Sequence, residues 1–198
     1  AGMTMRHGGA ATMFGGVRTD GSSAPMKLRD ISAHDEPRID MHDAELNRVL
    51  GGGMVQGSIT LLGGEPGIGK STLTLQTILN IPEKKVLYVS GEESAHQIKL
   101  RADRLAASIA LNQGTIGSQG AALGQAGSFD HISILCETSL EKIFSHIQEV
   151  APDIVVIDSI QTIATEDVDS SPGSVSQVRE CAAALLRFAK TSGIPVIL

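Results

Sequence analysis

Short apolar runs alternate with amphipathic segments along most of the chain. Five runs are apolar at nearly every position, which predicts buried strands at residues 59–62, 86–89, 132–135, 154–157 and 194–198. Strands that are apolar on both faces are typical of parallel sheets, because the connecting helices cover both sides. The pattern therefore predicts an α/β fold with a mainly parallel sheet and helices on both of its faces.

The segments between these runs have the period of amphipathic helices. A short helix is expected around Leu46, Val49 and Leu50, and a second from Ser71 to Asn80. Two more are predicted to begin at capping-box patterns, at Ser94–Gln97 (ending near Leu105) and Thr138–Glu141, and a last helix is predicted to start at Ser174–Gln177. The inward faces of the last two are predicted to consist of Leu140, Ile143, Phe144, Ile147 and Val150, and of Val175, Val178, Ala182, Leu185, Leu186 and Ala189.

Two regions lack this alternation of apolar runs and amphipathic segments. Residues 1–26 are rich in glycine, alanine, serine and threonine, and residues 1–37 are interpreted as a disordered or linker segment. Residues 38–198 then form the domain, and its glycine-, serine- and glutamine-rich stretch 106–130 is predicted to be a mobile surface insertion.

Composition narrows the class of protein further. Hydrophobic residues make up 41% and aromatic residues 3%, so the core is expected to consist of isoleucine, leucine, valine and alanine. The net charge of −6 does not decide whether nucleic acid binds. No apolar run approaches the roughly 18 residues of a membrane span, so a cytoplasmic protein without membrane contact is predicted. Cys136 and Cys181 are far apart and outside any CxxC pair, which favours free, buried thiols and no zinc.

A glycine-rich phosphate-binding loop follows the first predicted strand. It consists of Gly64, Glu65, Pro66, Gly67, Ile68, Gly69, Lys70 and Ser71, with Thr72 directly after it. Glycines let the backbone wrap tightly, so that N–H groups and the next helix N-terminus face a bound phosphate. In this motif Lys70 neutralises β- and γ-phosphate oxygens and the Ser71 hydroxyl ligates Mg²⁺. Thr72 is expected near the α-phosphate.

Acidic residues follow two other predicted strands. Asp158 ends the run 154–157, and in a protein with a phosphate loop such a carboxylate holds Mg²⁺, usually through water. Glu92 and Glu93 follow the strand at 86–89, where a carboxylate can orient and polarise an attacking water. Glu92 is the first candidate for the catalytic base and Glu93 for a main or assisting base. The alternative is that they are first-turn helix charges.

Two further residues are weaker candidates. Gln161 follows the metal-binding strand and could sense the γ-phosphate, although a surface amide fits the pattern equally well. Arg179 lies on the last predicted helix, where a solvent-exposed charge is the default interpretation.

Taken in order, these motifs resemble the RecA-like ATPase superfamily, and within it the RadA/Sms family of bacterial recombination proteins. The resemblance begins at Arg38 and rests on Glu45–Gly53, Gly63–Thr72, Leu87–Ser94, Gln97–Ala102, Val156–Thr162 and Ser171–Cys181. A phosphate loop alone identifies only a superfamily, whereas the last of these segments is close to a family signature.

The resemblance implies a P-loop NTPase fold and a DNA-dependent ATPase that uses ATP and Mg²⁺. In its full-length form such a protein is stimulated by DNA, promotes branch migration of recombination intermediates and forms a homo-hexamer on single-stranded or branched DNA. The recombinase RecA and replication or repair proteins are further expected partners. In the ring, the segment from Ala164 to Arg179 would lie near the central channel. Because Glu166, Asp167 and Asp169 make this segment acidic, Arg179 is the candidate DNA contact.

The family's four-cysteine zinc module and its Lon-protease-like domain have no counterpart in the sequence. The chain is therefore interpreted as a C-terminally incomplete ATPase core without zinc. Two alternatives remain. A KaiC-like regulatory ATPase also carries paired glutamates after its second strand, and acts through protein partners and phosphorylation. A nucleotide-binding fragment without appreciable turnover is expected if ring-completing residues come from a neighbouring subunit.

Overall fold

The computed structural model describes residues 27–30, 37–112 and 129–198. The chain divides into two units, residues 1–33 and 34–198. In the first unit, the described residues form a short 3₁₀ helix, η1 (Leu28–Asp30). The predictions for residues 1–26 and 113–128, a disordered segment and part of a mobile insertion, lie outside the described residues.

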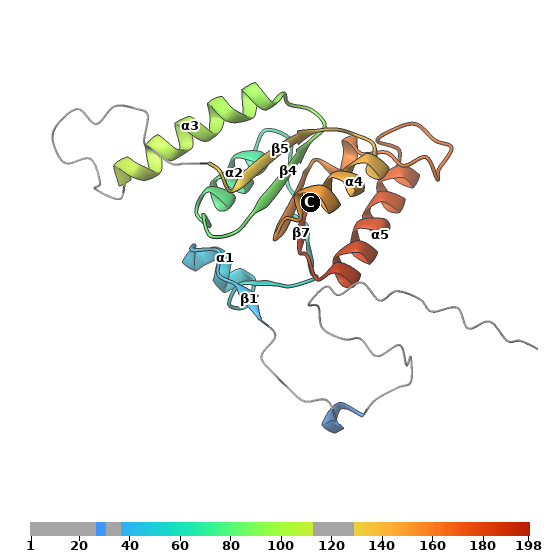
Figure 1. Cartoon of the computed structure of the whole chain (residues 1–198), viewed down its shortest axis with the longest axis horizontal. Helices are drawn as coiled ribbons and strands as arrows, with labels where there is room; N and C mark the ends of the chain where they lie inside the picture. The colour runs from blue at the N-terminus through green and yellow to red at the C-terminus, as the bar shows by residue number, and fades with distance from the viewer. Residues whose placement is uncertain (1–26, 31–36, 113–128) are drawn as a thin grey trace, which may run out of the picture. The chain divides into compact units, whose positions relative to one another are not determined.

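The second unit is built on a five-stranded parallel sheet in the order β3-β7-β6-β4-β5 (Figure 1). Its strands are β3 (Ile59–Thr60), β4 (Val86–Ser90), β5 (Ile132–Cys136), β6 (Ile154–Asp158) and β7 (Val196–Ile197). In the register of β4 with β6, Ser90 lies opposite Asp158. The predicted strands and the parallel α/β architecture are confirmed.

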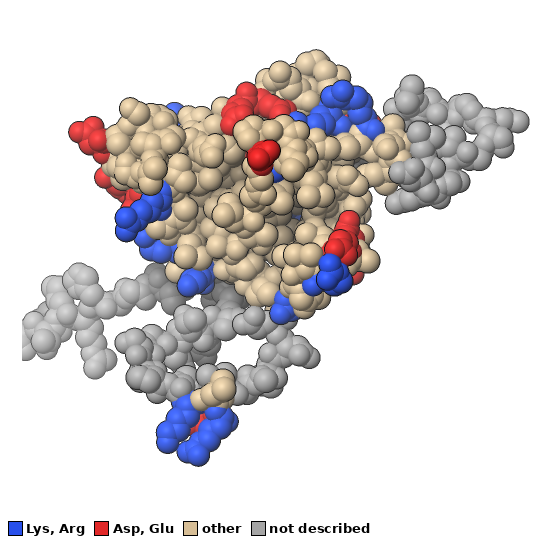
Figure 2. All heavy atoms as spheres, turned by 180° about the vertical axis from the view of Figure 1, so that it is seen from behind, with Lys and Arg blue, Asp and Glu red and all other residues tan. Residues whose placement is uncertain are grey.

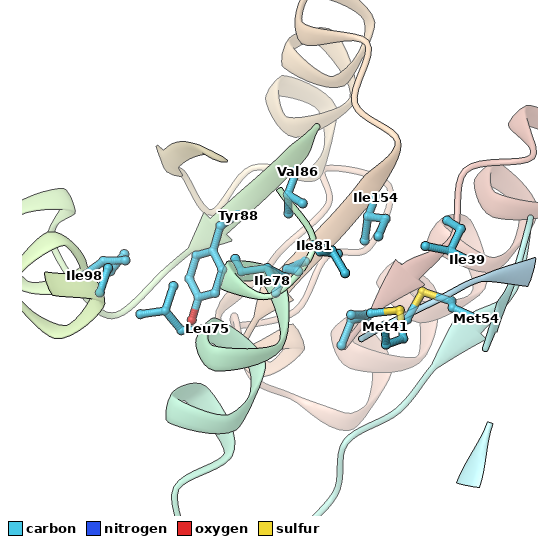
Figure 3. Close-up of a cluster of buried hydrophobic side chains, with 13 residues drawn as sticks. Ile39, Met41, Met54, Leu75, Ile78, Ile81, Val86, Tyr88, Ile98 and Ile154 are labelled. Carbon is cyan, nitrogen blue, oxygen red and sulfur yellow. The ribbon is translucent and has the colours of Figure 1, made fainter. Parts of the chain in front are cut away.

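Helices cover both faces of this sheet (Figure 1). The first layer contains α2 (Lys70–Leu79) and α3 (Ala95–Asn112), and the second contains α4 (Leu140–Val150) and α5 (Val175–Ser192). Alternate strand residues face the two layers. Tyr88 and Val156 belong to the core cluster under α2 and α3, shown in Figure 3, whereas Val89 and Ile157 belong to the cluster under α4 and α5.

A small antiparallel pair precedes the main sheet. Strand β1 (Arg38–Ile39) pairs with β2 (Met54–Val55), and helix α1 (Ala44–Val49) lies between them in the chain. Ile39, Met41 and Met54 extend the first core cluster (Figure 3). Two-residue strands are too short to show an alternating pattern, which is why the sequence did not reveal this pair.

Two helix details differ from the predictions. Helix α4 is capped by Ser139 rather than Thr138, because the Ser139 hydroxyl is the group that accepts the N–H of Lys142 in the first turn. The Glu137 carboxylate accepts the N–H groups of Thr138 and Ser139 at 2.8 and 3.0 Å. On α5, the predicted inward residues Leu185 and Ala189 are buried, but Val175 is 85% exposed, and Gln177 and Cys181 are buried although they were not predicted. The apolar face of α5 is therefore rotated from the predicted one, since Gln177 occupies a buried position.

Smaller differences concern one helix end and one thiol. Helix α3 continues past Leu105 to Asn112. Both cysteines are free, but only Cys181 is buried, because Cys136 ends the edge strand β5 and is exposed. Within the described residues, no helix has the length and apolarity needed to cross a membrane.

Candidate nucleotide-binding site

The phosphate loop connects β3 to α2, and its residues from Gly63 to Gly69 are exposed. Gly67 and Gly69 have φ angles of 79° and 100°. Side chains on a β-carbon disfavour this left-handed region, so glycine is required at both positions. Gly69 is also the N-cap of α2. The unpaired N–H groups of the first helical turn therefore lie directly after the loop, where they can bind an anion.

Lys70 closes the loop from the first turn of α2. Its Nζ donates hydrogen bonds to the carbonyl oxygens of Gly64 at 2.7 Å and Glu65 at 3.0 Å. The half-buried Ser71 and Thr72 follow it on the helix. A phosphate seated on this loop would meet a full positive charge as well as the helix dipole.

Asp158 lies at the end of β6, at the same edge of the sheet. It lines one pocket together with Lys70, Ile197 of β7 and Leu198. The buried Tyr88 donates its hydroxyl hydrogen to Oδ2 of Asp158. Burial, and next the hydrogen bond to Asp158, raise the pKa of Tyr88 far above its usual value, so its hydroxyl remains a donor. The Asp158–Ser159 peptide is cis.

The chemistry of this donor set fits Mg²⁺. Magnesium prefers oxygen ligands and keeps several of its waters, so it is typically bound by one or two carboxylates together with substrate phosphates. Asp158 offers a carboxylate and Ser71 offers a hydroxyl next to the phosphate loop. These residues could hold a magnesium ion that is shared with a bound nucleotide.

The two glutamates after β4 have different surroundings. The exposed Glu92 accepts a hydrogen bond from the Ser159 hydroxyl at 3.2 Å, directly beside Asp158 in the chain. The half-buried Glu93 forms two hydrogen bonds, of 2.8 and 2.6 Å, with the guanidinium of Arg101 on α3. Such a two-pronged pair fixes both side chains. Glu92 is thus the glutamate that adjoins the strand end that carries Asp158.

The remaining candidates lie farther along the chain. Gln161 is exposed in η2 (Ile160–Thr162), the 3₁₀ helix that begins after Ser159. Arg179 is exposed on α5, and no hydrogen bond or ion pair joins it to another described residue. Figure 2 shows one face of the molecule, where separate basic and acidic groups lie around the rim, acidic groups also lie in the upper middle, and most of the remaining surface is uncharged. The described residues of that face present no continuous basic track for a phosphate backbone.

Sequence reasoning missed three residues that shape this edge: Tyr88, Arg101 and Ser159. Two of them left a signal in the sequence. Tyr88 is the single tyrosine and lies in an apolar strand, where its hydroxyl requires a partner. Arg101 lies three residues after the buried Ile98 on one helix face, so its charge also required a partner.

The fold and the site together define a class of protein. A parallel sheet carries a phosphate loop after one strand and a carboxylate at the end of another, and both line one pocket. This is a P-loop nucleotide-binding fold of the RecA-like type. The chain matches the family described as AAA domain over residues 23–198, and it belongs to that family.

Three proteins named DNA repair protein RadA are close relatives. Those of Halalkalibacterium halodurans, Bacillus subtilis and Escherichia coli are 46%, 47% and 45% identical over 180, 176 and 179 residues. The alignments cover 90%, 88% and 90% of this chain but 35%, 34% and 35% of the relatives. The resemblance to the RadA/Sms family is confirmed, and the chain spans about a third of the relatives' length.

A solved structure supports the fold. The KaiC-like protein of Pyrococcus horikoshii superposes with a TM-score of 0.56 and is 22% identical. The match covers 82% of this chain and 69% of that protein. At this identity the likeness concerns the fold alone.

Proposed function

We propose that this chain is the nucleotide-binding core of a DNA-dependent ATPase of recombination and DNA repair, acting in branch migration of recombination intermediates. One observation carries the ATPase part: Lys70 and Asp158 line one pocket, and Glu92 is hydrogen-bonded to the residue after Asp158. The relation to proteins named DNA repair protein RadA supports the DNA repair part.

Each residue of the site has a role in this proposal. The phosphate loop binds the triphosphate through its N–H groups, and Lys70 neutralises the β- and γ-oxygens. Mg²⁺, held by Ser71 and Asp158, would supply charge neutralisation at the phosphates. Glu92 accepts a hydrogen bond from the attacking water and orients it toward the γ-phosphorus. Glu93 holds the turn after β4 in place through Arg101.

The DNA-binding part of the proposal concerns the segment from Ala164 to Arg179. The buried side chain of Gln177 holds it, accepting the N–H of Thr165 and donating to the carbonyls of Thr165, Val168 and Ser170 at 2.9–3.1 Å. In a homo-hexamer this segment would face DNA, with Arg179 as the phosphate contact. Each such contact adds to the salt dependence of binding.

The proposal is tested with this chain by measuring the binding of a fluorescent ATP analogue with and without Mg²⁺, and ATP hydrolysis with and without single-stranded DNA. Magnesium-dependent binding and DNA-stimulated turnover are expected. Arg179→Ala should reduce the DNA response and leave nucleotide binding unchanged. Lys190→Ala, which removes another exposed charge of α5, serves as the matched control and should have no effect.

Other results would favour the alternatives. Transfer of the γ-phosphate to the chain itself, without any response to DNA, would support a KaiC-like regulatory ATPase. Nucleotide binding without turnover under all conditions would indicate a binding module. Absence of nucleotide binding would contradict all three interpretations.

A further inference from the structure

Tyr88 connects the hydrophobic core to the candidate magnesium site. We infer that its hydroxyl is a positioning group for Asp158, which fixes the carboxylate so that its second oxygen is presented to the metal. The inference rests on the proposed nucleotide-dependent function and adds a residue to which the phosphate-loop motif assigns no role.

The position of Tyr88 explains how it reaches Asp158. Ser90 of β4 lies opposite Asp158 of β6, and Tyr88 is two residues before Ser90, so its side chain is on the same face of the sheet. Neighbouring strands lie about 4.8 Å apart and two residues of a strand span about 6.6 Å, so an aromatic side chain can reach from one strand to the next. The hydroxyl spans the gap between the strands and donates to Oδ2 of Asp158.

The core fixes the ring of Tyr88. The side chain has 0% exposure and packs in the cluster that contains Leu75 and Ile78 of α2 and Ile98 of α3 (Figure 3). Apolar residues surround the ring, and a phenol in such surroundings loses free energy unless its hydroxyl is hydrogen-bonded. Because the ring cannot shift, the position of the hydroxyl oxygen is set by the packing of α2 and α3 on the sheet.

This rigid donor restricts a side chain that is otherwise free to turn. The terminal torsion of an aspartate has a broad energy profile, so its oxygens exchange places easily without a partner. A carboxylate has about four acceptor sites, and therefore a bond to Oδ2 leaves Oδ1 available. Partners that orient a metal ligand typically change metal affinity or activity by 10- to 100-fold when they are removed.

Tyr88→Phe separates this role from packing, since it removes the hydroxyl and keeps the ring. The measurement is the Mg²⁺ concentration that gives half-maximal binding of a fluorescent ATP analogue, together with bound Mn²⁺ counted by electron paramagnetic resonance. We expect the variant to need about tenfold more Mg²⁺. Its nucleotide affinity in EDTA should equal that of the wild type.

Two further variants make the result specific. Ile98→Val removes one carbon from the same core cluster but leaves Tyr88 and Asp158 intact, so its Mg²⁺ requirement should stay at the wild-type value. Asp158→Ala removes the ligand itself and tests the proposed function. If the wild type and Asp158→Ala bind nucleotide with the same Mg²⁺ dependence, the proposed metal site is wrong. The positioning role of Tyr88 is then wrong as well.

The inference alone is overturned if Asp158→Ala loses its Mg²⁺ dependence while Tyr88→Phe has an unchanged or lower Mg²⁺ requirement. A lower melting temperature in Tyr88→Phe without a shifted Mg²⁺ midpoint leads to the same conclusion. In that case the Tyr88 hydroxyl contributes to the stability of the fold and not to metal binding.

Discussion

The phosphate loop and the acidic strand ends lie at the same site but keep their shape in different ways. The loop is exposed, and its path depends on two glycines with positive φ and on Lys70 bonding to two loop carbonyls. The acidic edge (residues 91–93 and 158–162) is held by side chains from distant segments. Its links are Tyr88 to Asp158, Ser159 to Glu92 and Arg101 to Glu93. The loop is thus a local structure, whereas the acidic edge is a product of tertiary packing.

Glycine itself has a different purpose in the two regions. A β-carbon at Gly67 or Gly69 would meet no atom within 4 Å, so the requirement there comes from the backbone angle. Gly91 has no positive φ, but a β-carbon would lie 2.0 Å from Oγ1 and 2.5 Å from Cβ of Thr162. At the acidic edge, glycine is required because β4 and η2 approach closely.

The largest effect is expected from Glu92→Gln. If Glu92 orients the attacking water, turnover should fall by about 10²- to 10⁴-fold, because general bases contribute rate factors of this size. Nucleotide affinity should stay within about twofold of the wild type, since no phosphate contact is removed. Single-turnover hydrolysis and equilibrium binding measure the two quantities.

Glu93→Gln is the matched control, because it removes the neighbouring carboxylate. It breaks a pair with Arg101, whose side chain is 19% exposed, and should lower the free energy of unfolding by about 1–3 kcal/mol. Turnover should fall less than in Glu92→Gln. The reverse order of the two rate losses would assign the base to Glu93.

On the loop side, Lys70→Ala should weaken ATP binding on the order of 100-fold. Hydrogen bonds to charged groups contribute about 1.5–3 kcal/mol each, and one tenfold change in affinity corresponds to about 1.4 kcal/mol. The thermal stability should change little, because the loop is exposed and the hydrogen bonds that the Lys70 side chain makes to described residues go to two carbonyls of this loop. Isothermal titration and thermal unfolding test both statements. A large drop in stability would show that the loop, like the acidic edge, depends on side chains.

Gly91 and Gly67 are required for different reasons, so one second substitution should restore the stability of an alanine variant at Gly91 but not at Gly67. Gly91→Ala should cost about 1–3 kcal/mol of stability through overpacking, and Gly67→Ala about 1–2 kcal/mol through backbone strain. Thr162→Gly removes the two nearest atoms that a new β-carbon at residue 91 would meet and leaves Cγ2 of Thr138, the third nearest, at 3.2 Å. It should therefore restore stability to Gly91→Ala but not to Gly67→Ala. Chemical denaturation of the single and double variants gives the coupling energy, and equal coupling in both would contradict the distinction.

The same contrast explains what the sequence could predict. The strands were visible as apolar runs, and the phosphate loop is one contiguous segment whose glycines and lysine indicate their own roles. Asp158 and Glu92 were candidates because each follows a strand. Their partners were not predictable, since Tyr88 and Asp158 are 70 residues apart and meet only in one register of β4 with β6. Pairing of this kind depends on the fold rather than on a local pattern.

The smallest effect concerns Glu141, which extends the side-chain links beyond the acidic edge. Its Oε1 accepts the Thr165 hydroxyl at 2.6 Å and the Glu166 N–H at 3.1 Å, and its Oε2 accepts the Ser139 hydroxyl at 2.9 Å. Burial works to raise the pKa of the Glu141 carboxyl. The hydrogen bonds, that of Thr165 foremost, outweigh it and lower the pKa to about 2.

A depressed pKa in the folded state contributes stability that is present above the ordinary value of 4.5 and is lost as the pH falls toward about 2. Because the Glu141 side chain is exposed, solvent screening reduces this contribution to on the order of 1 kcal/mol. Glu141→Gln should therefore be less stable at neutral pH and show a flatter decline in acid. Glu149→Gln, an exposed change on the same helix whose carboxylate contacts His146 rather than residues 164–170, is the control and should leave the protection of residues 164–170 at low pH as in the wild type. Hydrogen exchange at low pH should show the loss of protection at residues 164–170, and protection lost first in the phosphate loop would contradict the assignment.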